Sequence, residues 1–450
     1  MPINFLLLVA AAATPRSLGA TPITTVLAAD GMLPWLEKVA TWASRLDLPS
    51  NSLKGNITSG TDDVFVNANL ARVLLATYRL QEMRSPGKGD AEFLRQGLAW
   101  CDTLCSIQAQ VLSSKGKVAG YWGAGYPNIA GCKAPLRGRC AYGTNIYLGD
   151  TGTAATVLGV CHRLAHNATR RVAYEAAMRR FGTFVLEGTA RPPYNKKGAV
   201  AGFVDATTGA VGCGYYHCTN RTREDCSRVP PAGSQLDCPS TSAYTIATGT
   251  TGGAFFSELY GVSRDERHAR VAAAAVDYEA STILPSGEIP YLLDGANCTT
   301  ASCPPSLEVG GPWPYDTLTY ATEGVAGVAL HLPSASTNAT LVAQFARTVA
   351  FLVRTQKADG TWGSGQLDVS RSPRVVTLLS WWLRAVGDAD PYGARPAVDK
   401  YMRMLREHGA AYGALGGNTI TTGMAGLAVA DHLAFGASYG VTLSDADGRQ

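Results

Sequence analysis

Hydrophobic positions along the chain form two kinds of helical segment that alternate. One kind is apolar on all sides, as in 63–80, and such a helix must be surrounded by protein. The other kind is amphipathic, as in Ala91–Leu112, and shows one face to water. Further apolar segments are expected near 147–164, 245–260, 317–331, 373–386 and 419–435, and further amphipathic ones near 32–46, 170–187, 264–283, 338–356 and 394–408.

Strict alternation over six segments of each kind predicts an all-α (α/α)6 toroid, with six inner helices inside six outer ones. Strand-like segments are few and fall in loops. An α-solenoid is the main alternative, because it also alternates helices. We expect residues 20–450 to form a single toroid domain.

Loop lengths predict which end of the toroid carries function. Connections from an inner helix to the next outer one are short, whereas those in the other direction are long, near 113–146, 188–244, 284–316 and 357–372. The long loops must therefore gather at the end where the inner helices begin. Function concentrates on elaborated loops held by a rigid scaffold.

The first residues indicate secretion. An apolar run, Phe5–Ala13, followed by small residues reads as a signal peptide spanning 1–19, with cleavage after Ala13 or Gly19. No later segment offers about 18 uninterrupted apolar residues, so no membrane span is expected. A net charge of +4 without a Lys/Arg cluster gives no reason to expect nucleic acid.

Glycosylation sites and cysteines agree with an extracellular or secretory-lumen location. Five Asn-x-Ser/Thr acceptors are present: Asn56, Asn167, Asn220, Asn297 and Asn338. Eight of the eleven cysteines fall in the long loops, and local pairing would give Cys132 with Cys140, Cys213 with Cys218, Cys226 with Cys238 and Cys298 with Cys303. Zinc held by Cys213, His217 and Cys218 is a rival interpretation. We expect no metal and no cofactor, and we expect Cys161 to be a free buried thiol.

A short internal repeat points to two acids. Four apolar segments share a Gly followed two residues later by Ala, which lets helix backbones approach closely: Asp150–Ala154, Thr250–Ala254, Thr322–Ala326 and Thr421–Ala425. Within this repeat, Asp150 and Glu323 place carboxylates where sister segments have Thr. Both are expected near the starts of inner helices, as is Asp63, where the helix dipole also favours an acid.

The long loops and their exits are rich in residues that suit sugars. Aromatic faces pack on pyranose rings, and carboxylates bind sugar hydroxyls. We expect substrate contacts from Trp122, Tyr126, Tyr147, His217, Glu288, Tyr291, Trp313 and Tyr315. Glycosidic cleavage needs one acid and one base or nucleophile, for which Asp150, Glu323, Asp316 and Asp63 are the candidates. A lyase would instead use Tyr147, Tyr315 or His217 to abstract a proton.

The alternation of helices over the mature chain resembles the toroids of six-hairpin glycosidases and polysaccharide lyases. That resemblance implies a carbohydrate-active enzyme with its cleft at the end where the inner helices begin. The segment Gln356–Trp362 also fits the Q-x3-G-x-W repeat of terpene cyclases, in which it ties an outer helix to the next inner one. The aspartate-rich catalytic motifs of those cyclases are absent from this sequence.

Three functional classes follow. The favoured one is a secreted glycoside hydrolase or polysaccharide lyase, expected as a monomer acting on extracellular oligo- or polysaccharide. The second is a non-catalytic toroid that binds glycan or protein. The third is a terpenoid cyclase or prenyltransferase-like enzyme.

Overall fold

The computed structural model describes residues 31–46, 64–122, 146–190, 201–212, 214–215, 245–290, 314–332, 339–363, 372–387, 389–408 and 419–437. Predicted features outside these ranges include the signal peptide, four of the glycosylation acceptors and the eight loop cysteines.

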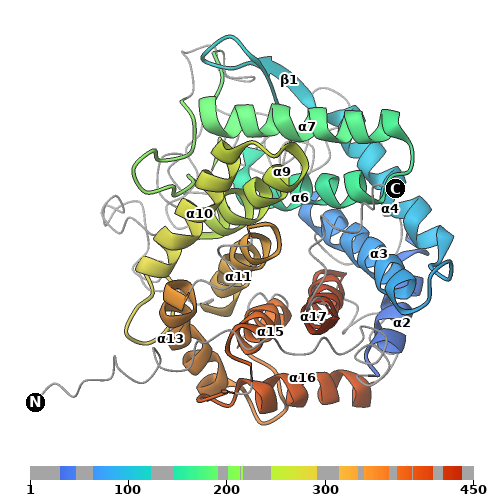
Figure 1. Cartoon of the computed structure of the whole chain (residues 1–450), viewed down its shortest axis with the longest axis vertical. Coiled ribbons are helices and arrows are strands. Elements are labelled where there is room, and N and C mark those ends of the chain that lie inside the picture. Colours follow the sequence, from blue (N-terminus) through green and yellow to red (C-terminus); the bar gives the residue numbers. More distant parts are fainter. Residues whose placement is uncertain are drawn as a thin grey trace, which may run out of the picture.

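Helices dominate the described residues and form two concentric layers (Figure 1). The inner layer consists of α3 (Val64–Arg84), α6 (Leu148–Leu164), the continuous segment α8 (Thr245–Ala247), η1 (Thr248–Phe255) and α9 (Phe256–Ser263), α11 (Pro314–His331), α15 (Val375–Val386) and α17 (Thr419–Ala437). The outer layer consists of α2 (Leu33–Ala43), α4 (Ala91–Ile107), α7 (Ala168–Glu187), α10 (Glu266–Ser281), α13 (Ala339–Thr355) and α16 (Ala394–His408). The predicted six inner and six outer helices are confirmed.

The inner helices close into a ring. Each packs against the next one along the chain, and α17 returns to pack against α3. The first and last repeats of a solenoid do not touch, so the contact between α17 and α3 excludes a solenoid and shows a toroid. In the ring, α3 and α11 are three steps apart and therefore face each other across the axis.

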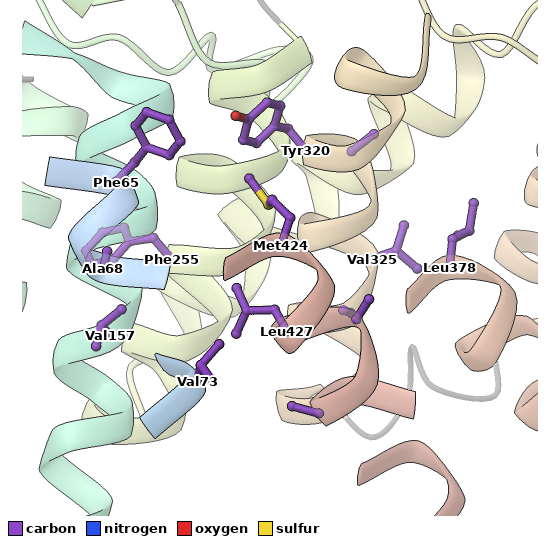
Figure 2. Close-up of a cluster of buried hydrophobic side chains, with 14 of the residues drawn as sticks. Phe65, Ala68, Val73, Val157, Phe255, Tyr320, Val325, Leu378, Met424 and Leu427 are labelled. Atoms are coloured by element: carbon purple, nitrogen blue, oxygen red, sulfur yellow. The ribbon is translucent and has the colours of Figure 1, made fainter. Parts of the chain in front are cut away.

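Side chains from all six inner helices fill the ring (Figure 2). Phe65, Val157, Phe255, Val325 and Met424 are among them, each less than about one-twentieth exposed. The core is therefore a packed interior and not an open channel along the whole axis.

Glycines set the closest approaches between inner helices, as the repeat predicted. A Cβ placed on Gly253 would lie 2.5 Å from the Cα of Gly324. One placed on Gly152 would lie 3.0 Å from the Cα of Thr251. Because real Cβ contacts are not that short, larger residues at these positions would force the helices apart.

Connections between the layers are asymmetric in the predicted direction. From inner to outer helix they are short, as in the step from α9 to α10 over 264–265. From outer to inner helix they are long, as in the steps from α4 to α6 and from α7 to α8. The long ones lead to the starts of the inner helices.

Three of the long connections contain the same five-residue turn in their first part. In each, the first N–H donates to the carbonyl of the fifth residue, and the glycine N–H donates to the carbonyl of the first, at 2.8–3.0 Å. The glycines have φ between +76° and +96°, a conformation that disfavours other residues. The turns are Ser113–Lys117, Leu284–Glu288 and Lys357–Thr361. Only the last of them was predicted from the sequence, through its Gln-Gly-Trp pattern.

The Gln356–Trp362 segment has a structural role, as the resemblance implied, but its contacts join two outer helices and not an outer helix to the next inner one. The Gln356 amide donates to the carbonyl of Ala397 on α16 at 2.9 Å. The indole N–H of Trp362 donates to the carbonyl of Leu352 at 2.8 Å, and its ring packs on Tyr401 with centroids 5.7 Å apart. The segment thus ties α13 to its outer neighbour α16.

One predicted helix boundary is wrong. The helix expected over Ala91–Leu112 ends at Ile107, and β1 (Ala109–Leu112) pairs antiparallel with β2 (Val118–Tyr121). Gln108 is the C-cap residue of the helix and has an extended backbone conformation. Its side-chain amide donates a hydrogen bond to the carbonyl of Ala177 on α7 at 2.9 Å. Tertiary packing on α7 therefore overrides the helical pattern of these residues. A second pair joins β3 (Ile146–Tyr147) to β4 (Gly214–Tyr215).

The prediction that Cys161 is a free thiol is also wrong. Cys161 on α6 forms a disulfide with Cys101 on α4, with Cα atoms 6.6 Å apart. Both side chains are fully buried where the outer helix packs on the inner one. Among the described cysteines the free one is Cys105, and burial raises the pKa of its thiol to about 12.

Candidate functional site

Two predicted acids lie at the starts of inner helices. Asp150 is the third residue of α6, and Asp316 is the third residue of α11. Their exposed fractions are 6% and 2%. A carboxylate in the first turn is stabilised by the positive end of the helix dipole. Both acids therefore belong to the end of the ring that the long connections reach.

Glu323 lies deeper than predicted, because α11 begins at Pro314 and Glu323 is its tenth residue. Oε2 is 3.4 Å from Nη1 of Arg72 on α3, across the ring. Oε1 is 3.5 Å from Nη2 of Arg374, which also pairs with Asp431 on α17. Glu323 is thus the centre of an ion network inside the ring, two helical turns below Asp316.

Three predicted substrate-binding residues are described near the same end. Tyr147 is half-buried and is the N-cap residue of α6. Tyr315 is 9% exposed and stacks on Phe351 with centroids 5.7 Å apart. Glu288 is half-buried in the turn after α10 and accepts a hydrogen bond from the Ser286 hydroxyl at 2.8 Å. Tyr147 and Glu288 keep accessible surface, as a substrate contact requires.

Trp122 has a packing role in this structure. Its indole N–H donates to the carbonyl of Leu104 at 2.8 Å, and its ring lies 5.2 Å from that of Phe181 on α7. Gln108 and Trp122 together join the outer helix α4 to the next outer helix, α7, in the same way as Gln356 and Trp362 join α13 to α16. The repeat was hidden in the sequence because eleven residues separate Gln108 from Gly120, against three in Gln356–Gly360. A substrate contact by Trp122 stays a prediction.

The remaining predicted site residues lie outside the described residues: Asp63, Tyr126, His217, Tyr291 and Trp313. Asp63 directly precedes Val64, the first residue of α3. Within the described ranges, no group of three or more His, Cys, Asp or Glu side chains could hold a metal ion. No helix in the part of the chain that the structure describes is long and apolar enough to cross a bilayer.

One buried acid on an outer helix was not among the predicted site residues. Glu279 of α10 is fully buried, and apart from the backbone amide of Gly249 no described group hydrogen-bonds its carboxyl oxygens. Burial holds the pKa of this carboxyl well above its usual range. A single Glu on an amphipathic helix gives no signal in the sequence, because its burial depends on how the helix is rotated.

The architecture matches solved structures of low sequence identity. An inactive α-1,6-mannanase variant from Salegentibacter sp. HEL1_6, with two adjacent aspartates replaced and α-1,6-mannotriose bound, matches with a TM-score of 0.53. It is 12% identical, and the match covers 89% of this chain and 98% of that one. A polysaccharide lyase matches with a TM-score of 0.52 at 11% identity, covering 89% and 97%.

A sugar epimerase from a ruminal bacterium matches with a TM-score of 0.50 at 11% identity, covering 84% of this chain and 87% of that one. No protein-family model matches the sequence. No curated protein matches it either. At these identities the likeness concerns the fold, and the chain has the (α/α)6-toroid fold of the six-hairpin glycosidase-like proteins.

Proposed function

We propose that the protein is a secreted carbohydrate-active enzyme, a glycoside hydrolase or a polysaccharide lyase. It acts on extracellular glycan in a carboxylate- and aromatic-lined cleft at the end of the ring where the inner helices begin. The observation that carries the proposal is that acids stand at the starts of separate inner helices: Asp150 on α6 and Asp316 on α11, with Asp63 directly before α3. Acids on separate helices of one ring are suited to flank a glycosidic bond.

The mannanase supports this assignment through one further comparison. Its inactive variant carries replacements of two adjacent aspartates. The present sequence contains one adjacent pair of aspartates, Asp62 and Asp63, at the step into α3. We therefore place Asp63 among the catalytic acids, with Asp316 on the helix that faces α3 across the ring.

In the hydrolase, one of these carboxyl groups protonates the leaving oxygen and another acts as base or nucleophile. Glu323, which pairs with the guanidinium groups of Arg72 and Arg374, is the deeper candidate acid. In the lyase, Tyr147 or Tyr315 abstracts the proton next to a uronate carboxyl group. Tyr147, Glu288 and the loop aromatics hold the sugar rings.

Substitution of the acids tests the proposal. Asp63→Asn, Asp150→Asn and Asp316→Asn are compared on a panel of glycans by product analysis. At least one should lower product formation about a hundred-fold or more. Asp390→Asn is the matched control, since Asp390 caps the outer helix α16 at the other end of the ring and Asn keeps one of its two acceptor oxygens.

Each outcome separates the candidate functions. New reducing ends without ultraviolet absorption indicate a hydrolase, and an unsaturated, absorbing product indicates a lyase. If the protein binds glycan without forming any product, it is a binding toroid. If all three aspartate variants keep full activity, the site is misplaced.

A further inference from the structure

One inner helix of the ring changes its winding near its start. The three residues of α8 (Thr245–Ala247) are followed by eight residues of π-helix, η1 (Thr248–Phe255), before the α-helix resumes as α9. Within the described part of the ring, this is the inner helix that contains a π-helical segment. Such segments are rare in proteins and occur frequently at functional sites. Contacts from the neighbouring helices must therefore stabilise the π form here.

The outer helix α10 packs closely on η1 and brings Glu279 beside its start. A Cβ placed on Gly252 would lie 2.7 Å from the Cβ of Ala275 on α10. Since two residues connect α9 to α10, the inner and outer helix run in opposite directions. One turn further along α10 therefore corresponds to one turn earlier in η1, which sets Glu279 against Gly249. The backbone N–H of Gly249 accordingly donates to the Glu279 carboxyl group.

Glu279 provides a hydrogen-bond acceptor at the point where the winding changes. Where an α-helix becomes a π-helix, two successive backbone N–H groups share one carbonyl, so an acceptor from outside the helix favours the π form. The Glu279 side chain is wholly buried, and its carboxyl oxygens have no other hydrogen-bond partner among the described groups. Its polar contact is therefore directed at η1.

Two hydroxyl groups of η1 hold the end of the ring that carries the predicted acids. The Thr251 hydroxyl donates to the carbonyl of Leu148 at 2.6 Å, in the first turn of α6 and two residues before Asp150. The Thr248 hydroxyl accepts a hydrogen bond at 2.9 Å from the N–H of Val211, in the long connection after α7. Because the direction of a side chain depends on the number of residues per turn, loss of the π form would turn both hydroxyls away from these partners.

We propose that Glu279 is a positioning residue for the catalytic end of the ring. By accepting the Gly249 N–H it keeps η1 in the π form, and η1 in turn fixes, through Thr251, the first turn of α6 with Asp150. Since Glu279 is buried on an outer helix, it acts through η1 and not on the glycan. Its effect on turnover rests on the proposed function, whereas its effect on α6 does not.

Hydrogen exchange of the full chain tests the first step. Glu279→Leu has a similar volume but no acceptor, and should speed exchange of the amides over 148–157 about ten-fold while those of α16 stay unchanged. Glu279→Gln keeps a carbonyl acceptor and should exchange as the wild type does. Asp277→Leu is the matched control, since Asp277 lies on the exposed face of the same helix.

Thr251→Val tests the second step, and does so even if Glu279→Leu does not fold. It removes the bond to Leu148 with little change in shape and should speed the same exchange. Thr77→Val, which loses a bond within its own helix to the Val73 carbonyl, should not. Unchanged exchange over 148–157 in Glu279→Leu or in Thr251→Val overturns the proposal, as does equal acceleration by Glu279→Gln.

Turnover separates this proposal from the proposed function. On a glycan that the wild type cleaves, Glu279→Leu should lower kcat about ten-fold with KM nearly unchanged, because displacement of a catalytic acid slows the reaction more than it weakens binding. Glu279→Gln should keep the wild-type kcat. Faster exchange with an unchanged kcat overturns the positioning role. A wild type that forms no product from any glycan refutes the proposed function, and the exchange results then still decide whether Glu279 fixes α6.

Discussion

Arg72 and Glu323 join opposite sides of the inner ring, with Nη1 of Arg72 on α3 lying 3.4 Å from Oε2 of Glu323 on α11. Glu323 is 1% exposed on its side chain, and its second partner, Arg374, is wholly buried. Two helices that do not pack directly against each other are thereby linked through the axis. The link lies below the end of the ring that carries Asp316.

Glu323→Gln should destabilise the fold strongly. It leaves two guanidinium groups without their shared carboxylate, and breaking a buried pair from one side costs about 3–5 kcal/mol. Arg72→Met should cost less, because the Arg72 side chain is 16% exposed and can be replaced by apolar packing. Chemical denaturation of both variants measures the difference.

Glu288→Gln is the control for that comparison, since Glu288 is half-buried and its carboxylate bonds only to the nearby Ser286 hydroxyl among the described groups. A Glu323→Gln protein as stable as Glu288→Gln would mean that the network contributes little. Glu323 would then be free for a catalytic role.

The sequence predicted the toroid because the spacing of hydrophobic residues along a helix shows how many of its sides are buried. An inner helix such as α6 must be apolar on all sides, and an outer one such as α10 must not, so order along the chain fixes the layer of each. The repeated glycines likewise predicted close approach, found at Gly253 and Gly324. These are properties of single segments.

Features that depend on which side chains meet could not be predicted in this way. Cys101 and Cys161 are 60 residues apart and pair because α4 turns one face to α6. The shared Thr-Gly pattern marks where neighbouring inner helices approach closely, and it does not give the distance from the first turn. The prediction that Glu323 lies near a helix start was therefore wrong. Asp150 was expected near a helix start and lies in the first turn of α6, whereas Asp316 was expected in the loop before its helix and lies in the first turn of α11 because that helix begins at Pro314.

Loss of the Cys101–Cys161 disulfide should lower stability. Closing a loop of about 60 residues reduces the entropy of the unfolded chain by an amount worth about 4 kcal/mol. The double variant Cys101→Ser, Cys161→Ser should therefore melt well below the wild type without reductant. Cys105→Ser removes the described free thiol and should change the melting temperature little; equal melting of both variants would argue against the disulfide.

Asn167 should carry a glycan without loss of its capping role. Its Oδ1 accepts hydrogen bonds from the backbone N–H groups of Thr169 and Arg170 at the start of α7, at 2.8 and 3.3 Å. A glycan is attached to the amide nitrogen, so the cap and the sugar use different atoms, and the residue is exposed.

Two variants separate these roles. Thr169→Ala removes the acceptor motif but keeps the cap, whereas Asn167→Gln removes both. Expressed through a secretory pathway, both should lose the mass of one glycan, and Asn167→Gln should also lose about 1 kcal/mol of stability. Unchanged mass in both variants would show that the site is unused.

Glu279 should make the protein less stable as the pH rises. Burial raises the pKa of its carboxyl well above the usual 4.5 in the folded state, with the Gly249 amide opposing the shift. Above pH 4.5 the group ionises in the unfolded chain while it stays protonated in the folded one. The free energy of unfolding therefore falls with rising pH until the folded-state pKa is reached.

Glu279→Gln cannot ionise, so its advantage in stability over the wild type should grow from pH 4 towards pH 8. Glu92→Gln provides a control of opposite sign. Hydrogen bonds from Arg95 and Gln96 lower the pKa of the exposed Glu92 to about 2. The stability of the wild type relative to Glu92→Gln should therefore increase as the pH rises towards 5. Denaturant melts of the three proteins between pH 4 and 8 measure both slopes. If the difference between Glu279→Gln and wild type does not change with pH, the Glu279 carboxyl has an unshifted pKa and must reach solvent or a basic partner.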